Sequence, residues 1–394
     1  MKNKTFLKIS ILSVFFVGMA VGTITPAIAS IAAAFPEVPF TTLLLVSTLP
    51  TLLSVPATLV SGRIAGTKVK YKTLLLVGMI LFLISGMSPY FIDNFTTILL
   101  FRAIFGISIG IMAPLGAVLI ISFFDGPERA SMMGISGVVG NVGGILFQLL
   151  GGVFAASNWN YAFLAHGIGI VTLLLVFFIP EPPKAPAPPI TDTNAPKMKM
   201  PKMVWVFAFM ALTLMMLNYP LLVNMSSLIA AYDMGTTADA AMVLTTFTIG
   251  GMVAGLLFAK LFGILKKNLA TVGLLLMALA MLSIASGTTI IFMYIGAALS
   301  GMGFSLIFPS LMIDLDSFVP GPLIPTASAM IVSFMNIGGF ISAYFYAFVA
   351  GILGQTENMK FPFIFATVAF FGATILYAVL KPKAADLPQT ETLQ

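Results

Sequence analysis

Two ionisable side chains, Arg102 and His166, lie inside long apolar stretches of the sequence. A guanidinium in such surroundings needs a partner, and it could bind an anion or control the movement of protons. The alternative is that Arg102 extends its side chain toward a polar boundary. His166 could carry a proton, since histidine titrates near neutral pH. It could equally be a neutral side chain that is hydrogen-bonded to a neighbouring helix.

Three amides form a second group of candidates. Asn141 and Gln148 are seven residues apart and therefore share one face of a helix. Asn336 follows Asn141 by 195 residues. Because each buried amide needs hydrogen-bond partners, these side chains could line a cavity that binds a solute. They could also join neighbouring helices beside the surrounding glycines, and both alternatives stay open.

The segment Asn218-Tyr219-Pro220, with Asn224 shortly after it, combines polar groups with a proline. Proline removes one backbone hydrogen bond and bends a helix. Asn218, Tyr219 and Asn224 are therefore candidates for a gate or a solute contact, with helix packing as the alternative.

The sequence lacks the groups that most enzymes and metal sites need. It has no cysteine and a single histidine, which excludes disulfides and thiolate sites and disfavours a metal centre. None of its 13 acidic residues lies clearly inside an apolar stretch, and no nucleophile–base pair is visible there. We therefore expect no enzyme activity, no catalytic residues, no metal and no cofactor.

The elements that must position these side chains are transmembrane helices. Hydrophobic residues make up 59% of the 394-residue chain and charged residues 8%, against about 25% charged residues in soluble domains. Such a chain cannot cover its apolar surface with polar groups, so the bilayer must act as its solvent. Spans of roughly 20 apolar residues predict twelve helices. They lie near 7–33, 41–65, 73–91, 96–123, 130–156, 161–180, 203–230, 239–263, 269–287, 289–312, 325–353 and 361–380.

The basic residues predict the orientation of the chain. With the N-terminus placed in the cytoplasm, sixteen lysines and arginines fall in inner segments and one, Lys360, falls in an outer loop. This asymmetry places both termini in the cytoplasm. It also accounts for the net charge of +6 without a nucleic-acid partner.

A proline- and lysine-rich segment divides the spans six from six. The predicted organisation is an N-terminal six-helix half at 1–180, a cytoplasmic linker at 181–202, a C-terminal six-helix half at 203–381 and a cytoplasmic tail at 382–394. Proline cannot sustain a helix in the linker.

The two halves are related by an internal repeat. An offset of 195 residues places Gly140–Gly144 on Met335–Gly339, and it also places Pro114 on Pro309, which we interpret as repeat-related kinks. Two parallel six-helix repeats are typical of secondary transporters, in which the halves rock around a site at their interface.

Four motifs resemble those of the major facilitator superfamily over nearly the whole chain. The stretch Gly62–Lys72 resembles the family's loop after the second span, with the basic cluster Lys68, Lys70 and Lys72, although Gly66 stands where the family has an acid. Arg102–Gly106 is similar to its arginine motif, and Asp125–Arg129 to its loop between spans four and five. The last resembles the antiporter glycine motif through Gly143, Gly151 and Gly152, with Phe147-Gln148 replacing its central Gly-Pro pair.

The resemblance implies an all-α membrane protein with the major facilitator fold, nearest to twelve-span drug and metabolite exporters. Two functions follow as hypotheses. The first is the export of apolar or amphipathic compounds by proton antiport, and the alternative is a carrier of a small organic anion with Arg102 as its contact. A sensor would need an extra soluble domain, and a channel would need repeated filter residues. We expect a monomer in the bacterial cytoplasmic membrane whose partners are a small-molecule substrate, protons and the lipid bilayer.

Overall fold

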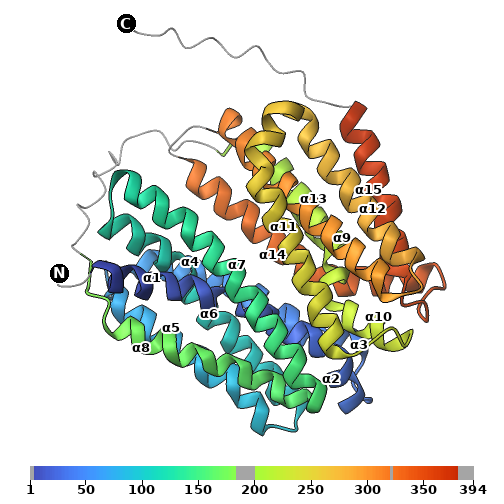
Figure 1. The fold of residues 1–394 in the computed structure, drawn as a ribbon, viewed down its shortest axis with the longest axis horizontal. Coiled ribbons are helices and arrows are strands. Elements are labelled where there is room, and N and C mark those ends of the chain that lie inside the picture. Colours follow the sequence, from blue (N-terminus) through green and yellow to red (C-terminus); the bar gives the residue numbers. More distant parts are fainter. Residues whose placement is uncertain (1–3, 183–199, 320–322, 380–394) are drawn as a thin grey trace, which may run out of the picture.

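The computed structural model describes residues 4–182, 200–319 and 323–379 (Figure 1). In this part of the chain all regular elements are helices, and twelve helical segments are long and apolar enough to cross a membrane. The prediction of an all-α membrane protein with twelve spans is therefore confirmed. The spans are Lys4–Ala34, Leu45–Ile64, Tyr71–Phe91, Phe95–Phe123, Gly126–Ser157, Trp159–Phe177, Lys202–Val223, Thr237–Phe258, Leu269–Ser286, Ile290–Ile313, Thr326–Ile352 and Phe361–Val379.

The first six spans are built from eight α-helices and three 3₁₀ segments. These are α1 (Lys4–Gly18), η1 (Ala20–Ala27), α2 (Ile28–Ala34), α3 (Phe40–Leu43), α4 (Leu45–Ile64), α5 (Tyr71–Met87), η2 (Ser88–Phe91), α6 (Phe95–Phe123), α7 (Gly126–Ser157), η3 (Trp159–Ile168) and α8 (Gly169–Phe177).

The second six spans contain α9 (Lys202–Val223), α10 (Met225–Ala231), α11 (Thr237–Leu265), η4 (Lys266–Asn268), α12 (Leu269–Ser286), α13 (Ile290–Phe318), α14 (Ile324–Ile352) and α15 (Phe361–Val379).

Three spans that the sequence predicts as continuous helices change their winding in the middle. The first contains η1, with Pro26 inside it, and the sixth begins with η3. The seventh divides into α9 and α10 at Asn224, four residues after Pro220. In the first and seventh spans, the missing proline amide interrupts the helical ladder and gives a physical reason for the change.

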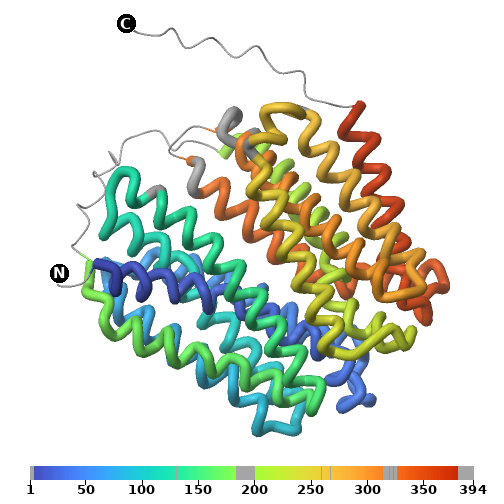
Figure 2. Tube along the Cα trace, in the orientation of Figure 1, coloured from blue at the N-terminus to red at the C-terminus, as the bar shows by residue number. Residues whose placement is uncertain are grey.

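The helices form two bundles with the same internal arrangement (Figure 2). In the first, α4 packs on α6 and α7 packs on α1 and η1, while in the second α11 packs on α13 and α14 packs on α9. Repeat-related glycines lie where α7 crosses α1 and where α14 crosses α9. A Cβ at Gly143 would overlap the Phe16 carbonyl oxygen, and one at Gly338 would overlap that of Leu212. These close approaches confirm the two pseudo-symmetric halves.

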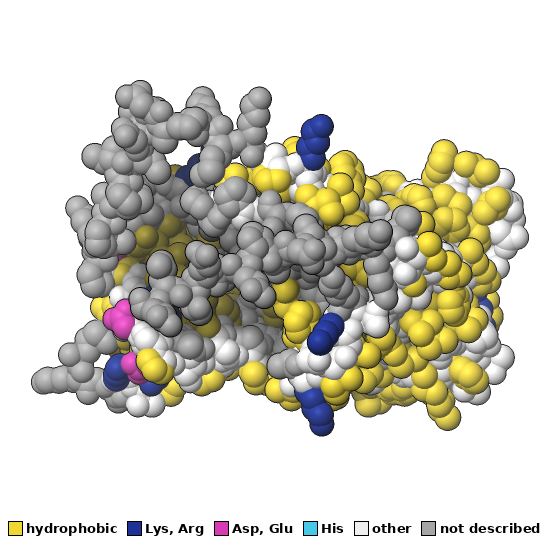
Figure 3. Space-filling view, turned by 90° about the horizontal axis from the view of Figure 1, so that it is seen from above, with side chains coloured by type: hydrophobic (Ala, Val, Ile, Leu, Met, Phe, Trp, Pro, Cys, Tyr) yellow, Lys and Arg dark blue, Asp and Glu magenta, His cyan; other side chains and the backbone are white. Residues whose placement is uncertain are grey.

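The outer surface of the bundles is apolar, as expected when lipid is the solvent. Large hydrophobic side chains such as Leu256 (81% exposed) and Phe91 (77% exposed) point outward. Figure 3 shows hydrophobic side chains spread over much of the visible surface of the described residues, with few charged ones among them.

The halves meet closely at one end of the molecule, where α2, α3 and α10 lie (Figure 1); we call it the α3 end. Ser226 of α10 hydrogen-bonds to Pro26 and Ala29, and Thr237 of α11 donates to the Gly152 carbonyl over 3.2 Å. At the opposite end, the ion pairs that the described residues form stay within the first half. The structure is therefore closed at the α3 end.

The predicted linker at 181–202 and tail at 382–394 fall largely or wholly outside the described residues. The boundaries of the halves at 180 and 203 stay a prediction.

Candidate functional site

Arg102 lies on α6 and is completely buried. Its Nε donates a hydrogen bond to the Val46 carbonyl oxygen of α4 over 2.7 Å, and its guanidinium carbon lies 4.5 Å from the centre of the Phe105 ring. The alternative that the side chain extends to a polar boundary is therefore wrong. Among the described residues, neither Nη1 nor Nη2 has a hydrogen-bond partner.

Arg102 also lacks a described counter-charge. The ion pairs in the described part of the chain join Lys4 and Lys8 to Glu128, and Arg129 to Asp125. A buried cation without an opposite charge costs several kcal/mol, of the order of the desolvation penalty of one ion. The site is therefore suited to attract an anionic or acceptor-rich group.

His166 lies on η3 inside a group of aromatic rings and is completely buried. Its Nδ1 is 2.9 Å from the Phe163 carbonyl oxygen in the same segment. The imidazole centre lies 4.8 Å from that of Phe105, 5.7 Å from Phe82 and 6.1 Å from Phe147. Arg102 and His166 thus share Phe105 as a neighbour.

Tyr219 of α9 reaches this region from the second half. The side chain is 6% exposed, packs with buried residues of the first half and interacts with the Thr51 side chain of α4. Val46, which accepts the Arg102 hydrogen bond, belongs to the same buried cluster as Tyr219. The structure therefore brings together Arg102, His166 and Tyr219, which lie on three different spans.

Three predicted amides occupy other positions. Asn218 is buried, and its Oδ1 accepts a hydrogen bond from Ser300 of α13 over 2.6 Å, whereas its Nδ2 has no partner among the described residues. The Gln148 side chain lies against Gly22 of η1, and its Oε1 is likewise unpartnered in the described part. Asn224 is half-buried, with an unpartnered buried Oδ1.

Asn141 and Asn336 are half-buried on α7 and α14, the repeat-related helices. Within the described chain, no hydrogen bond joins either side chain to a neighbouring helix. Their symmetric placement keeps them as candidates for the interface between the halves.

The stretch Gly62–Lys72 is held by an acid that lies outside the motif. The Glu181 carboxylate accepts hydrogen bonds from the backbone amides of Tyr71 (2.8 Å) and Lys72 (3.0 Å), and Lys72 Nζ donates to the Phe177 carbonyl over 2.5 Å. Gly66 has φ +72°, a conformation that favours glycine.

The remaining motif residues are distributed as follows. Lys68, Lys70 and Gly62 are exposed, Pro114 lies inside α6 and Pro309 inside α13. A Cβ at Gly151 would overlap the Thr23 carbonyl oxygen, and one at Gly152 would overlap the Ala241 side chain of α11 in the second half. Gly152 thus lies at the contact that closes the α3 end.

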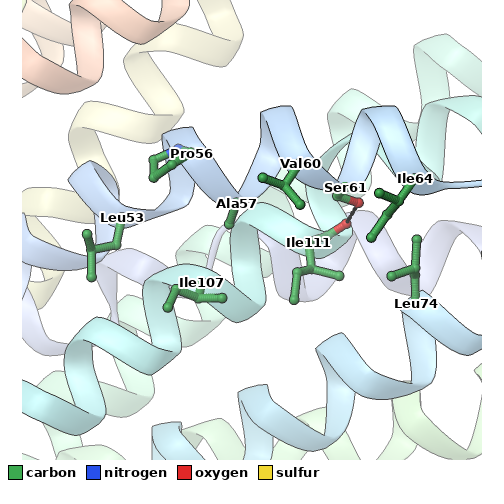
Figure 4. Close-up of a pocket in the computed structure, with 9 residues that line it drawn as sticks. All are labelled: Leu53, Pro56, Ala57, Val60, Ser61, Ile64, Leu74, Ile107 and Ile111. Atoms are coloured by element: carbon green, nitrogen blue, oxygen red, sulfur yellow. Dashed lines mark hydrogen bonds between the residues drawn. The ribbon is translucent and has the colours of Figure 1, made fainter. Parts of the chain in front are cut away.

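An apolar pocket of about 340 Å³ lies between α4, α5 and α6 in the first half (Figure 4). Its lining is aliphatic, and its one hydroxyl, that of Ser61, donates to the Ile111 carbonyl over 2.7 Å. The pocket contains none of the predicted site residues and could accept an aliphatic group.

Several residues that complete the region carried no signal in the sequence. Val46 contributes the backbone carbonyl that accepts from Arg102, and Thr51 of α4 contributes a side chain that interacts with Tyr219. Among the described residues, no group of three or more His, Cys, Asp and Glu could hold a metal ion.

Curated relatives match short parts of the chain. A multidrug transporter protein, MdtP of Bacillus subtilis (strain 168), is 27% identical over 122 residues, which is 30% of this chain and 22% of that protein. A multidrug efflux pump, SdrM of Staphylococcus aureus (strain N315), is 31% identical over 111 residues, 27% of this chain and 25% of that protein. The chain therefore matches about a quarter of the length of these relatives.

Solved structures match the whole fold. The nucleoside transporter NupG superposes with a TM-score of 0.73 at 14% identity, over 95% of this chain and 97% of that one. A bacterial homologue of the human lysosomal transporter Spinster, inward-facing and occupied, gives a TM-score of 0.73 at 15% identity, over 96% and 97%. A D-xylose–proton symporter gives 0.72 at 15% identity, over 92% and 96%.

The family model of the Major Facilitator Superfamily matches residues 10–343. Together with the twelve helical spans and the two related bundles, this match shows that the chain is an integral, multi-pass membrane protein that belongs to the Major Facilitator Superfamily of transporters.

Proposed function

We propose that the protein exports amphipathic organic compounds by alternating access, with protons as the counter-ion. The observation that carries this proposal is the buried Arg102 guanidinium, which has two unpartnered nitrogens and lies among aromatic rings. Such a site matches a compound that combines an apolar body with a hydrogen-bond acceptor. The similarity of short segments to multidrug transporters supports the same choice.

His166 is the candidate proton carrier because it is the single histidine of the sequence and lies buried inside a span. Organic cations fit less well, because the described spans place no carboxylate beside Arg102 to pair with them.

A second candidate function is the carriage of a small organic anion. It is favoured by the same two free guanidinium nitrogens, which could bind a carboxylate through two parallel hydrogen bonds. The two functions differ in coupling, since the first requires that substrate and protons move in opposite directions.

Proton movement in inside-out vesicles tests both functions. A pH-sensitive dye would report the gradient while amphipathic drugs and labelled small carboxylates are added to wild type, Arg102→Ala and His166→Ala. Collapse of the gradient by a drug, lost in His166→Ala, supports the exporter. Carboxylate transport without proton movement, lost in Arg102→Ala, replaces it with the anion carrier.

We also propose that both termini are cytoplasmic in a bacterial cytoplasmic membrane, so that the α3 end faces outward and the structure is inward-facing. The distribution of basic residues supports this orientation. Because the chain has no cysteine, Glu37→Cys can be labelled with a membrane-impermeant reagent in intact cells. We expect labelling in intact cells. Labelling that occurs only after lysis would place Glu37 inside the cell and contradict the proposed orientation.

We further propose that the protein functions as a monomer, which the mass of the detergent-solubilised protein would test by light scattering.

A further inference from the structure

The helix α2 follows directly on the 3₁₀ segment η1, and its first amide, that of Ile28, donates to the Thr25 carbonyl oxygen. Its N-cap residue is Ala27, whose side chain makes no capping hydrogen bond. The first amides of a helix have no partner within the helix.

Ser226 of α10 supplies a side-chain partner for the second amide of α2, that of Ala29, from the other half of the protein. Its Oγ accepts a hydrogen bond from the Ala29 amide over 3.3 Å and donates one to the Pro26 carbonyl oxygen over 2.5 Å. Ser226 is 2% exposed. Ala29 is the second residue of α2, which is where a capping side chain normally accepts its hydrogen bond.

The two hydrogen bonds join residues about 200 positions apart in the sequence. They can exist only while α10 lies against α2, which means while the α3 end is closed. Separation of the halves at this end would leave the Ala29 amide and the Pro26 carbonyl without Ser226. These two hydrogen bonds are thereby linked to the closure of the α3 end.

We propose that Ser226 is a positioning residue of the transport cycle, which holds the α3 end closed by capping α2 from the opposite half. The cap is removed whenever this end opens, so it sets the balance between the two orientations of the transporter. This inference rests on the contact between the halves and needs no knowledge of the substrate.

The neighbouring Ser227 is a matched control. It lies on the same helix and is 7% exposed, and its Oγ has no hydrogen-bond partner among the described residues. Loss of the Ser227 hydroxyl therefore removes a buried polar atom of the same kind without removing the cap.

Spin-label distance measurements on the reconstituted full-length protein test the proposal. The absence of cysteine allows labels at Glu37→Cys and Glu357→Cys, two exposed loop residues of opposite halves. In Ser226→Ala the ratio of long to short distances should rise about fivefold, the usual effect of losing one capping side chain. Ser226→Thr should restore the wild-type ratio, and Ser227→Ala should leave it unchanged.

Equal distance distributions in Ser226→Ala and Ser227→Ala would overturn the proposal, as would a lower melting temperature without a change in distances. If Ser226→Ala does not fold, hydrogen exchange measured on the wild-type protein tests the proposal instead. Conditions that lengthen the distance should also accelerate exchange in peptides that contain Ala29. Exchange that does not follow the distance would equally refute the linkage.

Discussion

Replacement of Arg102 by methionine should separate transport from stability. The native side chain gains a charge-assisted hydrogen bond to Val46, worth roughly 1.5–3 kcal/mol, and a desolvated contact with the Phe105 ring worth about 2 kcal/mol. Against these stands a cost of about 2.5–3.5 kcal/mol for an arginine in the centre of a membrane helix. Because the opposing contributions nearly cancel, we expect Arg102→Met to change the free energy of unfolding by at most ~2 kcal/mol.

Transport should nevertheless be lost in Arg102→Met, because methionine fills the space but presents no donor to the substrate. The assay is substrate-driven proton movement in vesicles, with thermal unfolding of the same purified protein measured in parallel. Lys360→Met is a suitable control. Lys360 also donates to a carbonyl, that of Gly287 at 2.6 Å, and lies 4.7 Å from the Tyr232 ring, but it belongs to the loop before α15.

Two results would refute this reasoning. If Arg102→Met transports substrate at the wild-type rate, the Arg102 charge has no role in the mechanism. Destabilisation well above ~4 kcal/mol, with loss of folded protein, would instead assign Arg102 a structural role. In contrast, Lys360→Met should keep both its transport rate and most of its stability.

Further predictions concern the contacts between helices. Gly143→Ala should destabilise the protein by about 1–3 kcal/mol through overpacking against Phe16. Gly137→Ala on the same helix has open space around it and should leave thermal unfolding unchanged. Equal melting temperatures of the two variants would contradict the close crossing. Tyr219→Phe should weaken the interaction with Thr51 across the halves and shift the spin-label distances toward the open α3 end, and an unchanged distribution would exclude Tyr219 from the gate.

The candidate site was only partly predictable from the sequence. Arg102 and His166 stand out because ionisable groups are rare in apolar spans, and Tyr219 stands out beside a proline. Their proximity in the fold was not predictable, because they lie on three spans and are separated by 64 and 53 positions in the sequence. Glu181 and Ser226 gave no signal, since one acid in a linker and one serine in a helix are common.

The number of spans, the two halves and their relationship were determined by the sequence itself. A bilayer requires about 20 apolar residues for every crossing, and a repeated pattern of glycines records repeated helix crossings. The tertiary structure alone decided that Arg102 bonds to Val46, that the α3 end is closed and that Ser226 caps a helix of the opposite half. These contacts join residues far apart in the chain, and they exist only in one arrangement of the two halves, which local sequence does not specify.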